Sequence, residues 1–198
     1  MVHRFARRLS EWLRRGDHGP EVTHHVVDGL PVRVLNTRPD IRTEDVLQRL
    51  TAALALIATY APRRYRRLRQ DFAGFVVQRF ACRGAFFPES RQCLVELTFT
   101  VNPRHGLAEI AASIVHEATH ARVSRMCGPR RPDQLAHEER LCRRAELELG
   151  LALPDGAVVA QRARESLALS DREVGPAVDW AEAARRVAAV DAAARERP

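Results

Sequence analysis

The chain has 198 residues, and 45% of them are hydrophobic, which predicts a folded globular protein rather than a disordered one. Its formal net charge of +7 would normally indicate an anionic partner. All 32 basic residues are arginine, however, so the charge reflects a general bias of composition and does not by itself indicate nucleic-acid binding. The longest uncharged hydrophobic run, residues 51–62, is too short to cross a bilayer, so we expect no transmembrane segment.

The N-terminal residues and the cysteines bear on the compartment. Residues 1–20 lack the continuous apolar stretch and the small-residue cleavage site of a secretory signal. The four cysteines include no CxxC pair and no zinc-finger spacing, so we expect mostly buried, reduced thiols at Cys82, Cys93, Cys127 and Cys142. These observations predict a cytoplasmic protein and leave its oligomeric state open.

No internal repeat or low-complexity linker divides the chain, so we expect a single domain over residues 1–198. Residues 1–20 predict an amphipathic helix, residues 21–150 a central core, and residues 151–198 a helical extension. Two strands are expected at 22–27 and 32–35, joined by the hairpin dipeptide Asp28-Gly29. Apolar residues at helical spacing then predict a helix over 43–60.

An arginine-rich segment over residues 63–69 follows that helix, beside Tyr60 and Tyr65. Such a patch can contact phosphates while the tyrosines stack on bases, so nucleic acid is one candidate partner. A solvated helix end is the alternative, and the general arginine bias favours it.

The second half of the core begins with two β-rich runs, residues 75–81 and 93–101, which we expect to pair as an antiparallel hairpin. Helices are then expected over residues 107–126, 133–149 and 157–169, followed by a last helix that carries Trp180. This order of elements predicts an α+β fold with a small antiparallel sheet.

The sequence His116-Glu117-Ala118-Thr119-His120 on the 107–126 helix contains an HExxH motif. Histidines four residues apart lie on one face of a helix, where both imidazoles can bind one metal ion. Glu117 points about 100° away around the axis, so it can act on a water molecule without ligating the metal. The motif therefore predicts a zinc centre in which Glu117 serves as general base for peptide hydrolysis.

The remainder of this helix supports the motif. Its apolar side chains gather on one face, and His116 and His120 project from nearly the opposite one. A helix that packs on a sheet while offering ligands to a cleft needs this arrangement. The alternative is that the opposite face is solvent and carries two surface histidines.

A catalytic zinc site needs a third protein ligand, and the next helix offers four candidates. They are His137, Glu138, Glu139 and Glu146. His137 and Glu139 lie about 200° apart around the helix, so they cannot both serve. Glu138 lies near the centre of the apolar stripe, where a buried carboxylate needs a partner such as a metal.

In this region the sequence resembles the gluzincin class of HExxH metallopeptidases, in which a glutamate on a following helix completes the site. Glu139 falls nineteen positions after His120, which reproduces the HExxH-x18-E spacing of one gluzincin branch. The resemblance covers His116 to Glu146 and implies a zincin-like fold with His116, His120 and Glu139 as zinc ligands. The family often has an acidic residue where this chain has Arg143; Glu146 is either its substitute as a partner of a ligand histidine or a surface residue.

The resemblance also implies a peptide or protein substrate, bound as an added strand along a sheet edge. The run Val95–Val101 is our candidate for that edge, and the following loop suggests His105 or Arg104 for stabilising the oxyanion. The sequence thus predicts a small zinc-dependent peptidase. Two alternatives are a nucleic-acid-associated protein and an interaction module that keeps a zincin scaffold without turnover.

Overall fold

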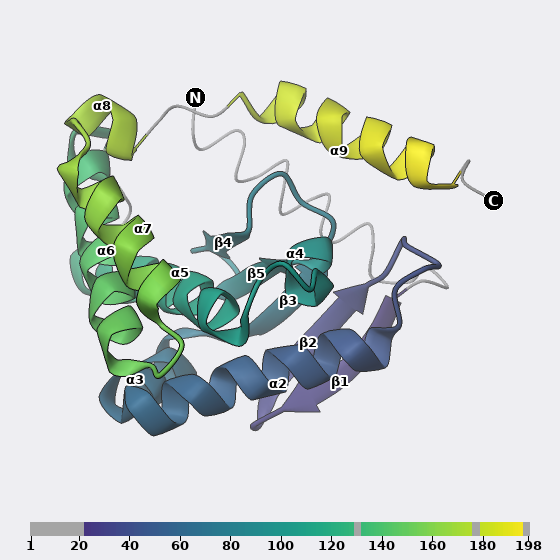
Figure 1. The fold of residues 1–198 in the computed structure, drawn as a ribbon, viewed down its shortest axis with the longest axis horizontal. Coiled ribbons are helices and arrows are strands. Elements are labelled where there is room, and N and C mark those ends of the chain that lie inside the picture. Colours follow the sequence, from purple (N-terminus) through teal and green to yellow (C-terminus); the bar gives the residue numbers. More distant parts are fainter. Residues whose placement is uncertain (1–21, 129–131, 176–178, 196–198) are drawn as a thin grey trace.

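A computed structural model describes residues 22–128, 132–175 and 179–195 (Figure 1). The first half contains β1 (Val22–Val27), β2 (Leu30–Leu35), α2 (Thr43–Tyr60), α3 (Pro62–Asp71) and β3 (Gly74–Gln78). The second half contains β4 (Gly84–Phe87), β5 (Gln92–Glu96), α4 (Leu97–Val101), α5 (Leu107–Cys127), a 3-10 turn (Pro132–Gln134), α6 (Leu135–Ala152), α7 (Ala157–Ala168), α8 (Asp171–Val174) and α9 (Trp180–Arg195). The predicted α+β class is confirmed. The amphipathic helix predicted over residues 1–20 lies outside the described residues.

The five strands form one mixed sheet in the order β1-β2-β3-β5-β4. β1 pairs antiparallel with β2, whereas β2–β3 and β3–β5 are parallel, and β4 lies antiparallel to β5 at the edge. The prediction of a purely antiparallel sheet is therefore wrong. The reason is that α2 and α3 connect β2 to β3 as a crossover, which brings the chain back in the same direction.

The hairpin predicted at Asp28-Gly29 is confirmed, with both residues at positive φ, 49° and 77°, as the tight turn requires. The second predicted hairpin is wrong, because β3 and β5 are parallel neighbours and β4 lies between them in sequence.

The alternating run 93–101 also ends its strand early, at Glu96. The Glu96 carboxylate accepts a hydrogen bond from the Phe99 backbone N–H at 2.6 Å and another from the Thr98 hydroxyl at 2.8 Å. These bonds cap the short helix α4, so capping prevails over the alternating pattern. Val95–Val101 is therefore not an edge strand; β4 is the edge on this side of the sheet.

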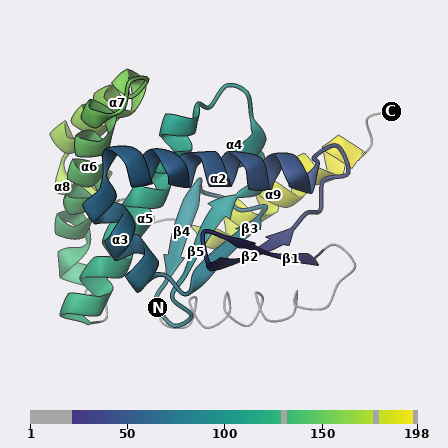
Figure 2. The same cartoon turned by 90° about the horizontal axis from the view of Figure 1, so that it is seen from below.

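Helices α2 and α5 pack on one face of the sheet and close the main core (Figure 2). Leu50, Leu54 and Ile57 of α2 are fully buried, as are Ile110 and Ile114 of α5. Helices α6 and α7 lie side by side beyond α5, on the side away from β1 and β2 (Figure 1). The motif helix is thus covered by the sheet and α2 on one side and by α6 on the other. No helix within the described ranges is long and apolar enough to span a membrane.

Candidate metal centre

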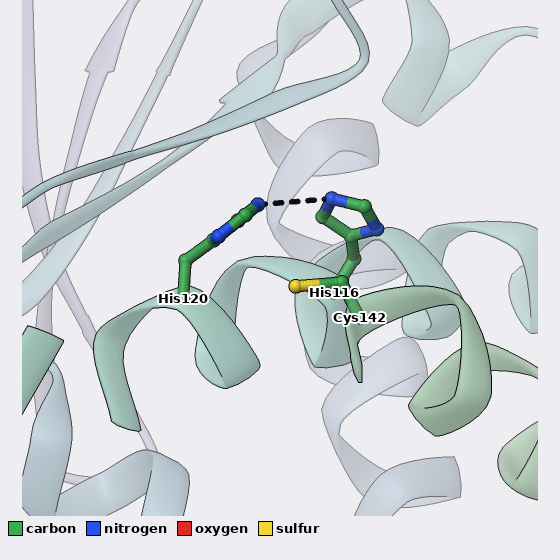
Figure 3. A group of neighbouring side chains, drawn as sticks. All are labelled: His116, His120 and Cys142. Carbon is green, nitrogen blue, oxygen red and sulfur yellow. Dashed lines mark hydrogen bonds between the residues drawn. The ribbon is translucent and has the colours of Figure 1, made fainter. Parts of the chain in front are cut away.

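The two motif histidines face one another at the α5–α6 interface. Their Nε2 atoms lie 3.1 Å apart, and Figure 3 shows the rings pointing toward each other, with the Cys142 side chain beside them. His116 and His120 are only 8% and 7% exposed, and Glu117 is 7% exposed. The alternative of two surface histidines is therefore wrong, because α6 covers the face that carries them.

Glu139 of α6 meets the same two ring nitrogens. Its carboxylate lies 3.3 Å from Nε2 of His116 and 3.4 Å from Nε2 of His120. In a tetrahedral site with metal–ligand bonds of about 2.0–2.1 Å, neighbouring ligand atoms are about 3.3 Å apart. The three separations are close to this value, although Oε2 of Glu139 faces His116 and Oε1 faces His120. The carboxylate therefore lies at ligand distance from both ring nitrogens.

The other nitrogen of each ring is held by its own carboxylate. Nδ1 of His116 lies 3.0 Å from Glu146, and Nδ1 of His120 lies 2.5 Å from Glu138. Arg143 stands where the gluzincin pattern often has an acidic residue. It donates a hydrogen bond to each Glu146 oxygen at 3.0 Å and so holds this carboxylate in place. Carboxylates behind metal-binding histidines commonly fix the ring orientation in this way.

Cys142 also reaches the site, which the sequence interpretation missed. Ligand atoms of His116, His120 and Cys142 all lie within 4.8 Å of one another, and the three residues are buried, so this group can hold a metal ion. A signal was present in the sequence, because residues 139, 142 and 146 recur at helical spacing and share one face of α6. In the sequence, however, the Cys142 thiol is equally consistent with an ordinary core residue of this helix.

The protonation of the metal-free cluster follows from its contacts. Burial disfavours a charged imidazole, but hydrogen bonds with Glu139 and Glu146 outweigh it and raise the pKa of His116 to about 9. The pKa of His120 is also raised, by Glu138 and Glu139 against the same burial. Burial opposes ionisation of Glu139, yet the two imidazoles hold its pKa well below the usual range. Because the two imidazoles hold their protons more tightly than usual, metal binding would have to displace those protons.

Glu117 lies on the sheet side of the cluster, against the edge strand. A Cβ added to Gly84 of β4 would come within 3.2 Å of Glu117 Cγ and Oε1 and within 2.9 Å of Ser113 Oγ. Burial and then the negative charge of Glu117 raise the pKa of the Cys82 and Cys93 thiols. The missing side chain at Gly84 therefore lets β4 approach α5 at the glutamate of the motif.

The remaining candidates lie elsewhere. His137 is exposed on α6, away from the buried cluster. His105 bonds Glu109 at 3.0 Å and precedes His116 by eleven residues, about 16 Å of helix rise, which is too far to contact an oxyanion at the histidine pair. Arg104 is exposed in the same loop. Cys93 and Cys142 are buried, as expected, whereas Cys127 is exposed and Cys82 only partly buried.

The arginine-rich segment forms α3, and part of it is used within the protein. Arg64 pairs with Glu148 of α6, and the Tyr65 hydroxyl donates to Asp28 at 2.7 Å. Arg63, Arg66, Arg67 and Arg69 are exposed, as a solvated helix end would be. Nucleic-acid binding by this segment stays a prediction.

No family model, curated protein or solved structure matches this chain, so its function has to be inferred from the geometry of the centre.

Proposed function

We propose that this protein is a zinc-dependent peptidase of the gluzincin type. The observation that carries the proposal is the arrangement of His116, His120 and Glu139, whose facing atoms are 3.1–3.4 Å apart. Separate carboxylates behind the two rings add support, because they occupy Nδ1 of each ring and so turn each Nε2 toward Glu139. In this proposal Glu139 is the third ligand, while Glu138 and Glu146 orient the histidines rather than bind the ion.

Zinc suits these donors, since it binds imidazole, carboxylate and thiolate in one four-coordinate shell. When bound, zinc polarises a peptide carbonyl and makes a water molecule acidic near neutral pH. Cys142 lies close enough to join the ligands or simply to pack beside them. A catalytic role needs a position open to water, so we assign Cys142 to packing.

Glu117 supplies the proton chemistry. Its carboxylate lies beside the histidine pair without the hydrogen bond to a ring nitrogen that Glu138 and Glu146 each make. It can take a proton from the attacking water on Oε1 or Oε2 and pass that proton to the leaving amine. The same residue therefore acts first as a base and then as an acid.

The edge strand β4 provides a place for the substrate. β4 pairs with β5 on one side, and no other strand of the described residues pairs with its second side, so that side can accept an added strand. Gly84 of this strand lies so near Glu117 that an added Cβ would come within 3.2 Å of its side chain, and a peptide laid along β4 would pass the general base. This supports an extended peptide or an unfolded protein segment as substrate.

Metal analysis tests the centre. Purified wild type should hold one zinc per chain, and His116→Ala and Glu139→Ala should lose it. Glu138→Ala should retain zinc but bind it about 10- to 100-fold more weakly, as loss of a histidine-orienting carboxylate does. Zinc lost from Glu138→Ala and kept by Glu139→Ala would reverse the two roles.

Cleavage of a peptide library tests turnover. Glu117→Gln should keep the zinc and lose at least about a hundredfold in cleavage rate. Full zinc with no cleavage by wild type would favour an interaction module. Salt-sensitive RNA or DNA binding that survives Glu117→Gln would favour the nucleic-acid alternative.

A further inference from the structure

Three arginines from separate elements converge beside the proposed zinc site. Arg83 comes from the loop between β3 and β4, Arg143 from α6 and Arg162 from α7. Arg83 and Arg162 each place Nη1 3.4 Å from the same oxygen of Glu109. Burial lowers the pKa of Arg83, and the charges of Arg162 and Arg143 are close enough to lower it further. We call these three residues the arginine cluster.

The cluster has more positive than negative charge. Its carboxylate neighbours are Glu109 and Glu146, so two carboxylates face three guanidinium groups. Glu146 is also hydrogen-bonded to His116, and Glu109 also accepts hydrogen bonds from His105 and from the Gly106 backbone N–H. Burial and then the repulsion from Arg162 lower the pKa of Arg83, in keeping with this excess charge. An added anion would balance the cluster.

The guanidinium groups are held in place but remain accessible. Arg83 lies over the ring of Phe99 at 5.1 Å, and Arg143 is fixed by two bonds to Glu146. The side chains of Arg83, Arg143 and Arg162 are 44%, 26% and 28% exposed. The contacts to Glu109 at 3.4 Å are long for hydrogen bonds, so a better-placed carboxylate can compete for these donors.

The cluster lies at a defined distance from the reaction centre. Arg143 is one helical turn beyond Glu139, and Arg83 directly precedes Gly84, which lies beside Glu117. Glu109 precedes His116 by seven residues, about 10 Å along α5. An extended peptide advances about 3.3 Å per residue, so this distance corresponds to about three substrate residues.

We propose that the arginine cluster binds a carboxylate of the substrate within about three residues of the scissile bond. The carboxylate is either an acidic side chain or the free C-terminus of the peptide, because both offer the same two oxygens to a guanidinium fork. The inference depends on the proposed peptidase function for its place beside the scissile bond. Such a site would make the protein select peptide substrates that are acidic near the cleaved bond or that end close to it.

Peptide capture tests the inference without turnover. Zinc-loaded Glu117→Gln protein is immobilised and exposed to four synthetic decapeptide libraries. The libraries contain or lack Asp and Glu, and they end in a free carboxylate or an amide. Retention that requires Asp or Glu identifies the side chain, and retention that requires the free acid identifies the C-terminus. Equal retention in all four libraries, or none in any, would overturn the inference.

Variants then assign the effect to the cluster. In the same background, Arg83→Gln and Arg162→Gln should each weaken retention about tenfold, and added salt should weaken it further. Arg83→Lys should restore part of the binding, because the charge is kept and only the fork is lost. The control is Arg164→Gln, an exposed arginine on the same helix as Arg162, and it should bind as the parent does. Unchanged retention in Arg83→Gln and Arg162→Gln would assign the preference elsewhere.

Cleavage by wild type distinguishes failure of the proposed peptidase function from failure of the proposed carboxylate site. Retained peptides that wild type leaves intact would contradict the peptidase function while supporting the carboxylate site. Peptides that are cleaved with no preference for a nearby carboxylate would contradict the carboxylate site alone.

Discussion

The two histidines differ in the carboxylate behind each ring. Glu146 shares its charge between His116 and Arg143, whereas Glu138 bonds His120 at 2.5 Å. Both carboxylates are nevertheless buried, at 2% and 6% exposure, so neither ring can rotate without breaking a buried hydrogen bond. The chain therefore orients both ligand nitrogens before any ion binds.

Gly84 is the residue on which the position of Glu117 depends most directly. In Gly84→Ala the new Cβ would meet Ser113 Oγ at 2.9 Å and Glu117 at 3.2 Å, and the glutamate would have to move. We expect kcat/KM to fall by about tenfold to a hundredfold, as small misplacements of catalytic groups do, with zinc content unchanged. Peptide cleavage and metal analysis of the same preparation measure both quantities.

A second substitution controls for this steric explanation. Adding Ser113→Ala to Gly84→Ala removes the nearer contact and should recover part of the lost activity. Loss of zinc in Gly84→Ala, or activity equal to wild type, would show that Gly84 does not hold Glu117 in position.

At the scale of single residues, the sequence predicts which side chains of one helix lie on the same face. The histidine pair and the glutamates on the next helix were all identified as candidates, since helical periodicity fixes which residues share a face. The same periodicity places Cys142 on the face that carries Glu139 and Glu146, so its approach to the site has a signal in the sequence. Gly84 has none, because its importance comes from a contact between two elements that a single sequence does not display.

Helix α3 is joined to the two helices of the centre by charged pairs of unequal burial. Asp71 is 2% exposed and lies 3.0 Å from Arg125 and 3.7 Å from Arg122, both on α5. Arg64 pairs with Glu148 of α6, where the glutamate side chain is 66% exposed. Removing the partner of a buried charge lowers the free energy of unfolding far more than removing the partner of an exposed one.

We therefore expect Asp71→Asn to lower the free energy of unfolding by about 1–2 kcal/mol, because Arg122 and Arg125 would lose a buried counter-charge while their own side chains stay partly in water. Glu148→Gln, the matched change at the exposed pair, should cost less than about 1 kcal/mol. Urea unfolding at neutral pH measures both. Equal effects would mean that Asp71 makes no more than a surface contribution.

The elements themselves were largely predictable, whereas their pairing was not. The helices over 43–60 and 107–126 and the first hairpin follow from local periodicity and turn chemistry. The parallel pairing of β2 with β3 follows from the helical crossover through α2 and α3. The pairing of β3 with β5, which leaves β4 at the edge, is not encoded by any local pattern. The error at residues 97–101 has a local cause, the cap that Glu96 provides.

At the scale of the whole molecule, Tyr65 is one of the residues that link the β1–β2 hairpin to the helices. This α3 residue donates to Asp28 in the β1–β2 turn at 2.7 Å. Burial and then this hydrogen bond raise the pKa of Tyr65 to about 12, above its ordinary value near 10. The protonated side chain therefore stabilises the fold below pH 10, and that contribution is lost as pH rises from about 10 to 12.

Global unfolding in denaturant should reveal this pH dependence. At pH 8 wild type should be more stable than Tyr65→Phe by about 1 kcal/mol, the usual contribution of one hydrogen bond. At pH 11 the difference should be smaller. Tyr60→Phe, at the exposed end of α2, is the control and should show no such trend. A difference between wild type and Tyr65→Phe that stays constant from pH 8 to pH 11 would contradict the assignment.

All side chains of the proposed centre belong to one helix pair that is continuous in sequence. His116 and Glu146, its outermost members, are 30 residues apart, whereas β2 and β3 pair residues such as Val32 and Phe75 from more distant parts of the chain. The entropy lost on closing a loop grows only slowly with length, but it has to be offset before distant contacts stabilise the fold. During synthesis the helix pair can therefore gather its donors as soon as α6 emerges, and an ion bound there would hold α5 and α6 together while α7 and α9 are still being made.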